Sequence, residues 1–335
     1  SVNLPVRIAH ANLYYQRMGR HDVSRQSIFF EPNIWLRGNA WEIKAKMNSE
    51  LPDLTTMVNY RDDSNPMNII LGNMQLRNIH YYDIEGGKTF EGKKHSRLNI
   101  NMGYHQTDNA VAYSLLFDKQ TGVSTVQPIS VNGNYRIDLG IGYTRPLDKK
   151  EKLSIDNQAS FNYNHNVDMA MVQGATQSQR SIVNNWKISN VLKLNYRLDD
   201  NYEFTLHGGG TYYLIKSQRE GFSNIHAGDY NIGVNVQVAL PWKLQLTTDL
   251  TMFARRGYQL SEMNTTDWIW NAQLSRSFIN KKLLVKLQGF DILRQLSNTQ
   301  YLMNAQGRTE TWNNSIPRYM MLSLSWRFNV NPKKK

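Results

Sequence analysis

Apolar and polar residues alternate with a period of two over long stretches of this chain. Between positions 135 and 143, Tyr135, Leu139 and Tyr143 share one parity with two isoleucines, while Arg136 and Asp138 share the other with two glycines. Successive side chains of a β-strand point to opposite faces, so this pattern predicts a strand with one apolar and one polar face. The alternation recurs in many segments along the chain, which predicts an all-β protein.

The hydropathy of the chain excludes a membrane-spanning helix, because no run of 18 apolar residues occurs and the mean hydropathy is −0.56. A transmembrane β-barrel remains possible, because its strands alternate apolar and polar residues and its mean hydropathy is therefore that of a hydrophilic chain. A soluble β-sandwich also alternates. The barrel is favoured because the segments are roughly twice as long as globular strands, because aromatic residues gather at their ends, and because tight and long connections alternate.

The predicted fold is a transmembrane, antiparallel, up-and-down β-barrel that occupies residues 1–335 as one domain. About fourteen strands are expected, and Pro5, Pro32 and Pro52 interrupt the pattern of the first three. The stretch 49–94 is interpreted as the longest connection. The predicted strands are 4–17, 27–36, 41–48, 95–106, 109–118, 134–145, 152–166, 184–198, 202–216, 229–240, 242–254, 266–279, 282–294 and 317–329.

The polar faces of these strands must line the lumen, because lipid offers no partner to polar groups. Most such side chains would bond to one another, to water or to a plug, and a minority would contact cargo. Loop aromatics could stack on a sugar or chelate, although packing within the loop is the commoner role. The candidate lumen residues are Arg136, Asp138, Asp156, Lys187, Glu203, His207 and Asp249, and the loop aromatics are Tyr81, Tyr82 and Trp312.

Several classes of function find no support in the sequence. The chain has no cysteine, and its eight histidines form no closely spaced pair, so neither a metal site nor another cofactor is expected. The net charge of +12 is spread along the chain without a basic motif, which argues against nucleic acid. A phosphate loop ending at Lys88-Thr89 would need glycine where Tyr82 stands. We therefore expect no enzyme, although a catalytic triad is spatial and cannot be traced in sequence.

Three short motifs resemble the TonB-dependent outer-membrane receptors, and most closely the Bacteroidetes β-barrel group that includes SusC-like proteins. The first motif keeps its asparagine, proline, glycine and leucine positions but has Met74 where the group has proline. The second is similar to the penultimate strand of that group. The third resembles a C-terminal insertion signal, although seven residues follow its phenylalanine. The matching residues are Asn65, Pro66, Gly72, Asn73 and Leu76, then Phe290 and Asp291, then Trp326 and Phe328.

The resemblance implies a 22-stranded barrel preceded by a plug domain, of which this chain looks like the C-terminal part without the plug. It further implies import of a nutrient such as a glycan or siderophore across the bacterial outer membrane. The implied partners are outer-membrane lipid and lipopolysaccharide, the plug and TonB complex, the barrel assembly machinery and a surface lipoprotein. One alternative is a complete, passive or structural porin-like barrel of 14 strands, since 14 is also an even number and such a barrel could close. Another is a soluble β-rich binding protein.

Overall fold

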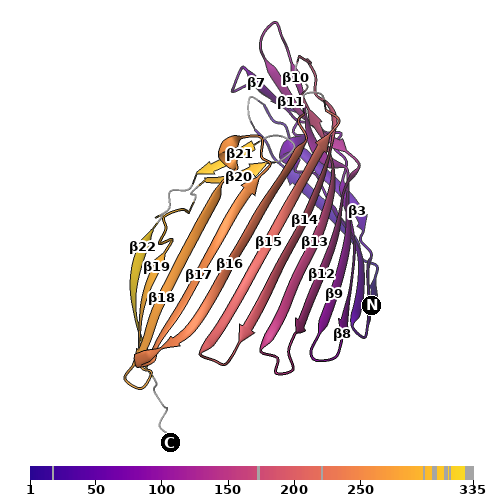
Figure 1. The fold of residues 1–335 in the computed structure, drawn as a ribbon. Coiled ribbons are helices and arrows are strands. Elements are labelled where there is room, and N and C mark those ends of the chain that lie inside the picture. The colour runs from indigo at the N-terminus through magenta and orange to yellow at the C-terminus, as the bar shows by residue number, and fades with distance from the viewer. Residues whose placement is uncertain are drawn as a thin grey trace, which may run out of the picture.

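In a computed structural model, the chain forms a curved antiparallel sheet of 14 strands in which chain neighbours mostly pair with one another (Figure 1). The structure describes residues 1–16, 19–171, 174–219, 222–296, 299–303, 308–312, 316 and 318–328. In their order across the sheet, the strands are β1 (Val2–Asn3), β4 (Asn33–Gly38), β5 (Trp41–Glu50), β8 (Ile79–Glu91), β9 (Arg97–Asp108), β12 (Asn134–Pro146), β13 (Leu153–Ala170), β14 (Gln179–Arg197), β15 (Tyr202–Ser217), β16 (Ile225–Leu240), β17 (Leu244–Arg256), β18 (Thr266–Phe278), β19 (Leu283–Phe290) and β22 (Tyr319–Trp326).

Three smaller sheets and three short 3₁₀ helices complete the described chain. Strands β7, β10 and β11 lie beyond the end of the large sheet that is opposite the tight turns (Figure 1). The four-stranded sheet contains β10 (Ala110–Phe117), β11 (Ser124–Val131), β7 (Asn68–Leu71) and β6 (Arg61–Asp62); the two-stranded sheets are β2 (Val6–Leu13) with β3 (Val23–Phe30) and β20 (Thr299–Met303) with β21 (Arg308–Trp312); the 3₁₀ helices are η1 (Leu54–Met57), η2 (Pro241–Lys243) and η3 (Ser261–Met263). No helix within the described ranges has the length and apolar character needed to cross a membrane.

Prolines explain why the first hairpin is divided between two sheets. Strands β1 and β4 pair Asn3 with Asn33, and β2 and β3 pair Val6 with Phe30 in the same register. Between them stand Pro5 and Pro32, which have no N–H to donate to a ladder. One continuous hairpin is therefore interrupted at the prolines, as the sequence predicts.

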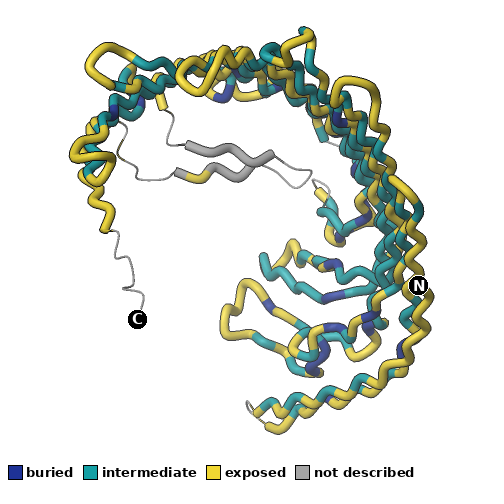
Figure 2. Tube along the Cα trace, turned by 90° about the horizontal axis from the view of Figure 1, so that it is seen from below, coloured by how far each residue is buried: buried dark blue, intermediate teal, exposed yellow. Residues whose placement is uncertain are grey.

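The apolar parity forms the convex face of the sheet and the polar parity the concave face. At the end of the sheet away from the tight turns, polar-parity residues Val183, Ile215 and Ala227 are buried together, with Phe222 and Tyr258 of the long connections packed on them. The long connections thus fold over this face, and Figure 2 shows chain segments inside the open arc of the sheet. The opposite parity leaves large apolar side chains such as Leu139 and Ile188 exposed. This arrangement is that of a membrane barrel, polar inside and apolar outside.

The expected number of strands is confirmed, but three assignments within it are wrong. Residues 109–118 correspond to β10, which pairs with β11 in the four-stranded sheet rather than in the barrel wall. The stretch 49–94, interpreted as a connection, contains β8, which is a barrel strand between β5 and β9. Residues 4–17 correspond to β2, which pairs with β3 in a two-stranded sheet, and the wall strand before it is β1. The prediction thus included two strands that lie outside the wall and omitted two wall strands, β1 and β8, so the total agreed. The larger barrel of 22 strands stays a prediction.

Candidate functional site

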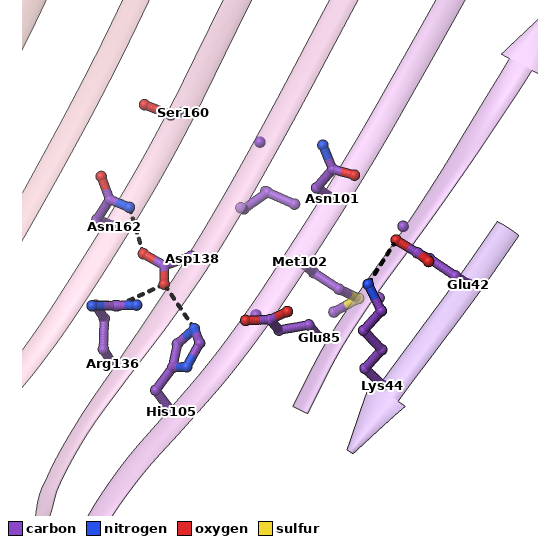
Figure 3. A pocket seen from close by; sticks show the side chains of 15 residues that line it. Glu42, Lys44, Glu85, Asn101, Met102, His105, Arg136, Asp138, Ser160 and Asn162 are labelled. Carbon is purple, nitrogen blue, oxygen red and sulfur yellow. Dashed lines mark hydrogen bonds and ion pairs between the residues drawn. The ribbon is translucent and has the colours of Figure 1, made fainter. Parts of the chain in front are cut away.

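Charged and polar side chains from neighbouring strands meet at one place on the concave face (Figure 3). In the register of the sheet, Asp138 of β12 lies opposite both Gly103 of β9 and Asn162 of β13. Gly103 lies in turn opposite Glu85 of β8. Directly paired residues of antiparallel strands share a face, so the register alone brings these positions together.

His105 is the centre of a hydrogen-bonded network that joins side chains of four adjacent strands, β8, β9, β12 and β13. Its Nδ1 lies 2.6 Å from Asp83 Oδ1 and its Nε2 lies 3.3 Å from Asp138 Oδ2. Arg136 Nε donates to Asp138 Oδ2 over 2.6 Å, and Asn162 Nδ2 donates to Asp138 Oδ1 over 2.5 Å. The imidazole therefore bridges two carboxylates, and one of them also receives a guanidinium and an amide. Charge-assisted bonds of this kind are among the stronger ones in proteins.

Further charges surround this network. Lys46 Nζ lies 3.4 Å from Asp83 Oδ2, and Lys44 Nζ donates to Glu42 Oε1 over 3.3 Å. Glu85 is exposed, and the described residues form neither an ion pair nor a hydrogen bond with its side chain. The site thus combines paired charges with one carboxylate that is available to a solute.

Glycines of the polar parity create the hollow at this site. Gly87, Gly103 and Gly140 belong to three adjacent strands and line a pocket of about 500 Å³ together with the charged residues. A Cβ atom at Gly103 would come 3.0 Å from His105 Nε2, so the missing side chain lets the imidazole reach across β9 toward Asp138. The floor of the pocket is backbone, and its walls are side chains.

Further along the concave face, another pair of side chains meets across a glycine of an intervening strand. His207 of β15 and Thr251 of β17 are hydrogen-bond partners over 3.3 Å, although β16 lies between their strands. Gly233 of β16 makes this possible, because a Cβ atom there would stand 2.5 Å from Thr251 Oγ1 and 2.7 Å from His207 Nε2. The Nδ1 atom of His207 is buried and has no hydrogen-bond partner within the described chain.

The structure brings together two of the predicted lumen residues, Arg136 and Asp138. Their neighbour across the sheet is Lys187, which lies opposite Asn162 and stands over the ring of Tyr213 at 5.9 Å. Parity alone places all three residues on one face, and the register of the strands makes Lys187 their neighbour.

The other predicted lumen residues lie elsewhere on the same face. Thr144 Oγ1 donates to Asp156 Oδ2 over 2.8 Å, and Asn271 Nδ2 donates to Asp249 Oδ2 over 2.9 Å. Glu203 lies opposite Gln237 near the tight-turn end of β15. Asp156 and Asp249 thus bond to wall residues. Contact of any of these residues with cargo stays a prediction.

The three aromatic residues predicted in loops all belong to strands. Tyr81 and Tyr82 are consecutive residues of β8, and Trp312 is the last residue of β21. Tyr82 lies opposite Gln106, and Gln106 lies opposite Tyr135, so Tyr82 and Tyr135 share the convex face. The hydroxyl of Tyr81 is 3.3 Å from Glu50 Oε2. The loop assignment of Tyr81 and Tyr82 was wrong because Gly86 and Gly87 are typical of a turn, although glycine is tolerated in a strand where side chains crowd.

A loop tyrosine is tied to the concave face. Tyr258, which follows β17, donates its hydroxyl to Asp229 Oδ1 over 2.8 Å, and Arg255 Nε lies 3.8 Å from the same oxygen. Burial raises the pKa of Tyr258 well above its ordinary value, and the hydrogen bond to Asp229 raises it further. The phenol therefore remains a hydrogen-bond donor and fixes the connection over the sheet.

The first sequence motif has a structural role near β7. Any side chain at Gly72 would collide with the backbone carbonyl of Val58. Asn73 Nδ2 donates to the carbonyl of Pro128 over 2.9 Å, and Leu76 is buried against Met57. The remaining two motif residues stand just before β7, where Asn65 Oδ1 accepts from the backbone of the residue after Pro66, at 3.1 Å. The motif thus packs the chain after β7 against β11 and against the segment that contains η1.

The second motif ends β19. Phe290 stacks on Tyr319 with ring centroids 4.5 Å apart. Asp291 is buried, and its carboxylate accepts from the backbone N–H groups of Gln295 and Leu296 at 3.0 Å each, which closes the turn.

The third motif lies at the tight-turn end of the sheet. Trp326 is the last residue of β22, and Phe328 follows it with the ring centroids 6.2 Å apart. Both side chains are exposed. Their role as an insertion signal stays a prediction.

Sequence reasoning missed Asp83, Glu85 and His105. The first two lie in β8, whose assignment as a connection removed them from consideration, and His105 has the polar parity of β9. A signal was present, because Gly87, Gly103 and Gly140 all occupy the polar parity of strands that prove to be neighbours.

The arrangement offers carboxylates, an amide, a guanidinium and an imidazole to a polar solute. Within the described ranges, no group of three or more His, Asp or Glu side chains could hold a metal ion.

Comparisons with known proteins agree with this architecture. The model of the outer membrane protein beta-barrel family matches residues 35–209 and 175–326. None of the curated proteins matches the chain.

Solved structures of one receptor match the chain over part of their own length. The ferric enterobactin receptor PfeA in complex with BCV-L6 has 13% identity and a TM-score of 0.47, and the match covers 93% of this chain and 49% of that one. A mutant of PfeA from Pseudomonas aeruginosa in complex with enterobactin has 12% identity, a TM-score of 0.47 and coverages of 91% and 45%. A second mutant from the same organism has 13% identity, a TM-score of 0.48 and coverages of 91% and 44%. The chain spans slightly less than half the length of these structures.

Proposed function

We propose that this chain, which belongs to the outer membrane protein beta-barrel family, forms part of the wall of a TonB-dependent importer in the bacterial outer membrane. The cargo is a polar nutrient such as a glycan or siderophore, which passes through the lumen without covalent change. One observation carries the proposal: a pocket of about 500 Å³ on the concave face, with Glu85 unpaired beside the Asp83–His105–Asp138 network.

The site suits transient binding better than catalysis. Most of its charges are already paired within the wall, so a solute would exchange bonds with side chains that are held in place. Volumes of 300–1,000 Å³ are typical of small-molecule sites. A transport site must bind its cargo and then release it, which moderate, polar contacts allow.

The open sheet supports a larger assembly. The edge strands β1 and β22 do not pair with each other in the described part of the chain. An unpaired strand edge in lipid leaves backbone groups without partners. We propose that further strands complete a barrel of 22, that a plug domain fills it, and that TonB energises it. Trp326 and Phe328 would serve the barrel assembly machinery, and a SusC-like receptor would also bind a surface lipoprotein.

Energy dependence is the property that tests the importer. Cells that lack the gene and cells in which the full-length gene is restored are supplied with labelled siderophores and labelled oligosaccharides. We expect uptake of one compound only in the restored strain, and its loss when a protonophore collapses the proton gradient or when TonB is deleted. Gene-dependent permeation that survives both treatments would instead identify a passive porin-like barrel.

The role of the pocket is tested in the same cells. Glu85→Gln removes the unpaired charge without changing the shape of the side chain, and we expect the concentration for half-maximal uptake to rise about tenfold, equivalent to about 1.4 kcal/mol. Glu151→Gln is the matched control, because Glu151 stands in a tight turn outside the pocket and pairs with His95. Equal uptake by the two variants would remove this pocket from the proposed path.

A further inference from the structure

A second hollow, on the convex face, has a different chemistry. It has a volume of about 530 Å³ and lies over β17, β18, β19 and β22. Its lining is predominantly apolar and includes Leu246, Leu274, Leu287 and Met320. All four have the parity of the convex face. Leu246 pairs with Leu274, and Leu274 pairs with Leu287. Met320 pairs with Gly289, which lies two residues after Leu287 in β19 and so on the same face. The groove therefore opens toward the hydrocarbon of the membrane.

Two small residues form the floor of this groove. Ala272 of β18 and Gly289 of β19 are direct partners in the sheet, so the smallest side chains on the convex face of these strands lie next to each other. The row below them consists of Leu246, Leu274 and Leu287. Ile292 closes the other side, because a Cβ atom at Gly289 would lie 3.3 Å from its side chain. The groove is a gap in an otherwise bulky apolar surface.

One end of the groove is basic. Arg318 and Tyr319 line it at the start of β22, which is the end opposite the tight turn between β18 and β19. Arg318 is exposed, and no carboxylate of the described residues pairs with it. An unpaired guanidinium next to an apolar groove matches a ligand with a phosphate above a hydrocarbon chain.

We propose that this groove binds lipopolysaccharide, with an acyl chain over Ala272 and Gly289 and a lipid A phosphate on Arg318. The long-connection end of an outer-membrane barrel faces the cell exterior, so a lipid reaching Arg318 from that side belongs to the outer leaflet. The head group of such a lipid lies at the level of the basic end, and its chains descend along the leucine row. This site is independent of the lumen pocket and of the proposed transport.

The test uses the full chain folded in detergent and freed of lipid. Bisphosphorylated lipid A is titrated in, and native mass spectrometry counts the bound molecules. We expect one tightly bound molecule per chain, and at least tenfold weaker binding for Arg318→Gln and for Ala272→Leu, which removes the charge or fills the floor. A shift in migration between unboiled and boiled samples on a denaturing gel confirms that each variant is folded.

Two control variants make the same chemical changes on the convex face outside the groove. Arg276→Gln removes a basic group at the tight-turn end, where the guanidinium stands over Phe278 at 4.7 Å, and Ala159→Leu enlarges an alanine of β13. Both should bind lipid A as the unchanged protein does. Dephosphorylated lipid A and phosphatidylglycerol should bind at least tenfold more weakly. Full binding by Arg318→Gln or Ala272→Leu would overturn the proposal, and so would equal binding of phosphatidylglycerol.

Discussion

Asp138 and Leu139 are consecutive residues of β12, yet they belong to two environments that are held together differently. The Asp138 carboxylate bonds to Arg136, to Asn162 and to His105 from a neighbouring strand. Leu139 is 37% exposed on the convex face and has apolar partners in Met102 and Phe161 across the strands.

The comparison shows that the two faces depend on different solvents. The concave face is ordered by directed bonds that cross strands, and water can replace many of them. The convex face has large exposed apolar side chains that only a hydrocarbon environment can stabilise. A polar change should therefore be severe on one face and mild on the other.

The largest expected effect tests the difference between the convex and the concave face directly. Leu139→Arg places a charge in hydrocarbon, and we expect a loss of roughly 2–4 kcal/mol in the free energy of unfolding if the site is near the midplane. Unfolding by denaturant in lipid vesicles measures it. A change below that of Asp138→Asn would mean that the inside and outside of the barrel are exchanged.

An intermediate effect tests the glycines of the concave face. Gly233→Ala would force Thr251 and His207 apart and press on the carbonyl of Leu250, so we expect a loss of about 1–3 kcal/mol, as for overpacking. Gly140→Ala is the matched control, since its Cβ atom would meet nothing nearer than Asn101 Cβ at 4.0 Å. If both variants unfold at the same denaturant concentration, a glycine at position 233 is not needed for His207 and Thr251 to meet.

A smaller effect is expected at Asp138 itself. Asn keeps the shape and two hydrogen-bonding atoms but loses the charge that faces Arg136 and His105, so Asp138→Asn should lose about 1–2 kcal/mol. Asp156→Asn is a useful comparison, because Thr144 gives Asp156 a neutral hydrogen bond. The same unfolding assay should rank Asp138→Asn above Asp156→Asn, and the reverse order would deny the network its stabilising role.

The smallest effect lies outside both faces, at a tight turn. Backbone N–H groups of Leu153 and Lys150 hold the pKa of Asp148 below its usual range. A lowered folded pKa stabilises the protein fully above the unfolded value of about 3.9 and no longer does so once the pH falls through the folded value. The difference in midpoint between the unchanged protein and Asp148→Ala should therefore be constant near pH 7 and vanish in strong acid. A difference independent of pH would exclude the ionised carboxylate as its cause.

Much of the wall could be predicted because each strand carries its own signal. The residues of β12 to β18 alternate clearly, and their predicted bounds agree with the structure to within a few residues. Strand β8 was missed because Gly86 and Gly87 resemble a turn when only the local sequence is considered. Strand β10 was misplaced for a different reason: it alternates, but alternation does not identify the sheet to which a strand belongs.

The sequence by itself determined which residues face the same side, because side-chain direction in a strand depends only on parity. It therefore placed Arg136, Asp138 and Lys187 on one face and Leu139 on the other. Only the tertiary structure decided which strands are neighbours and in what register, since pairing joins residues far apart in the chain. That register brings Asp83 and His105 to Asp138 over Gly103, and it places Ala272 beside Gly289 beneath the outer groove. Both hollows arise where small residues on adjacent strands coincide, which no single strand encodes.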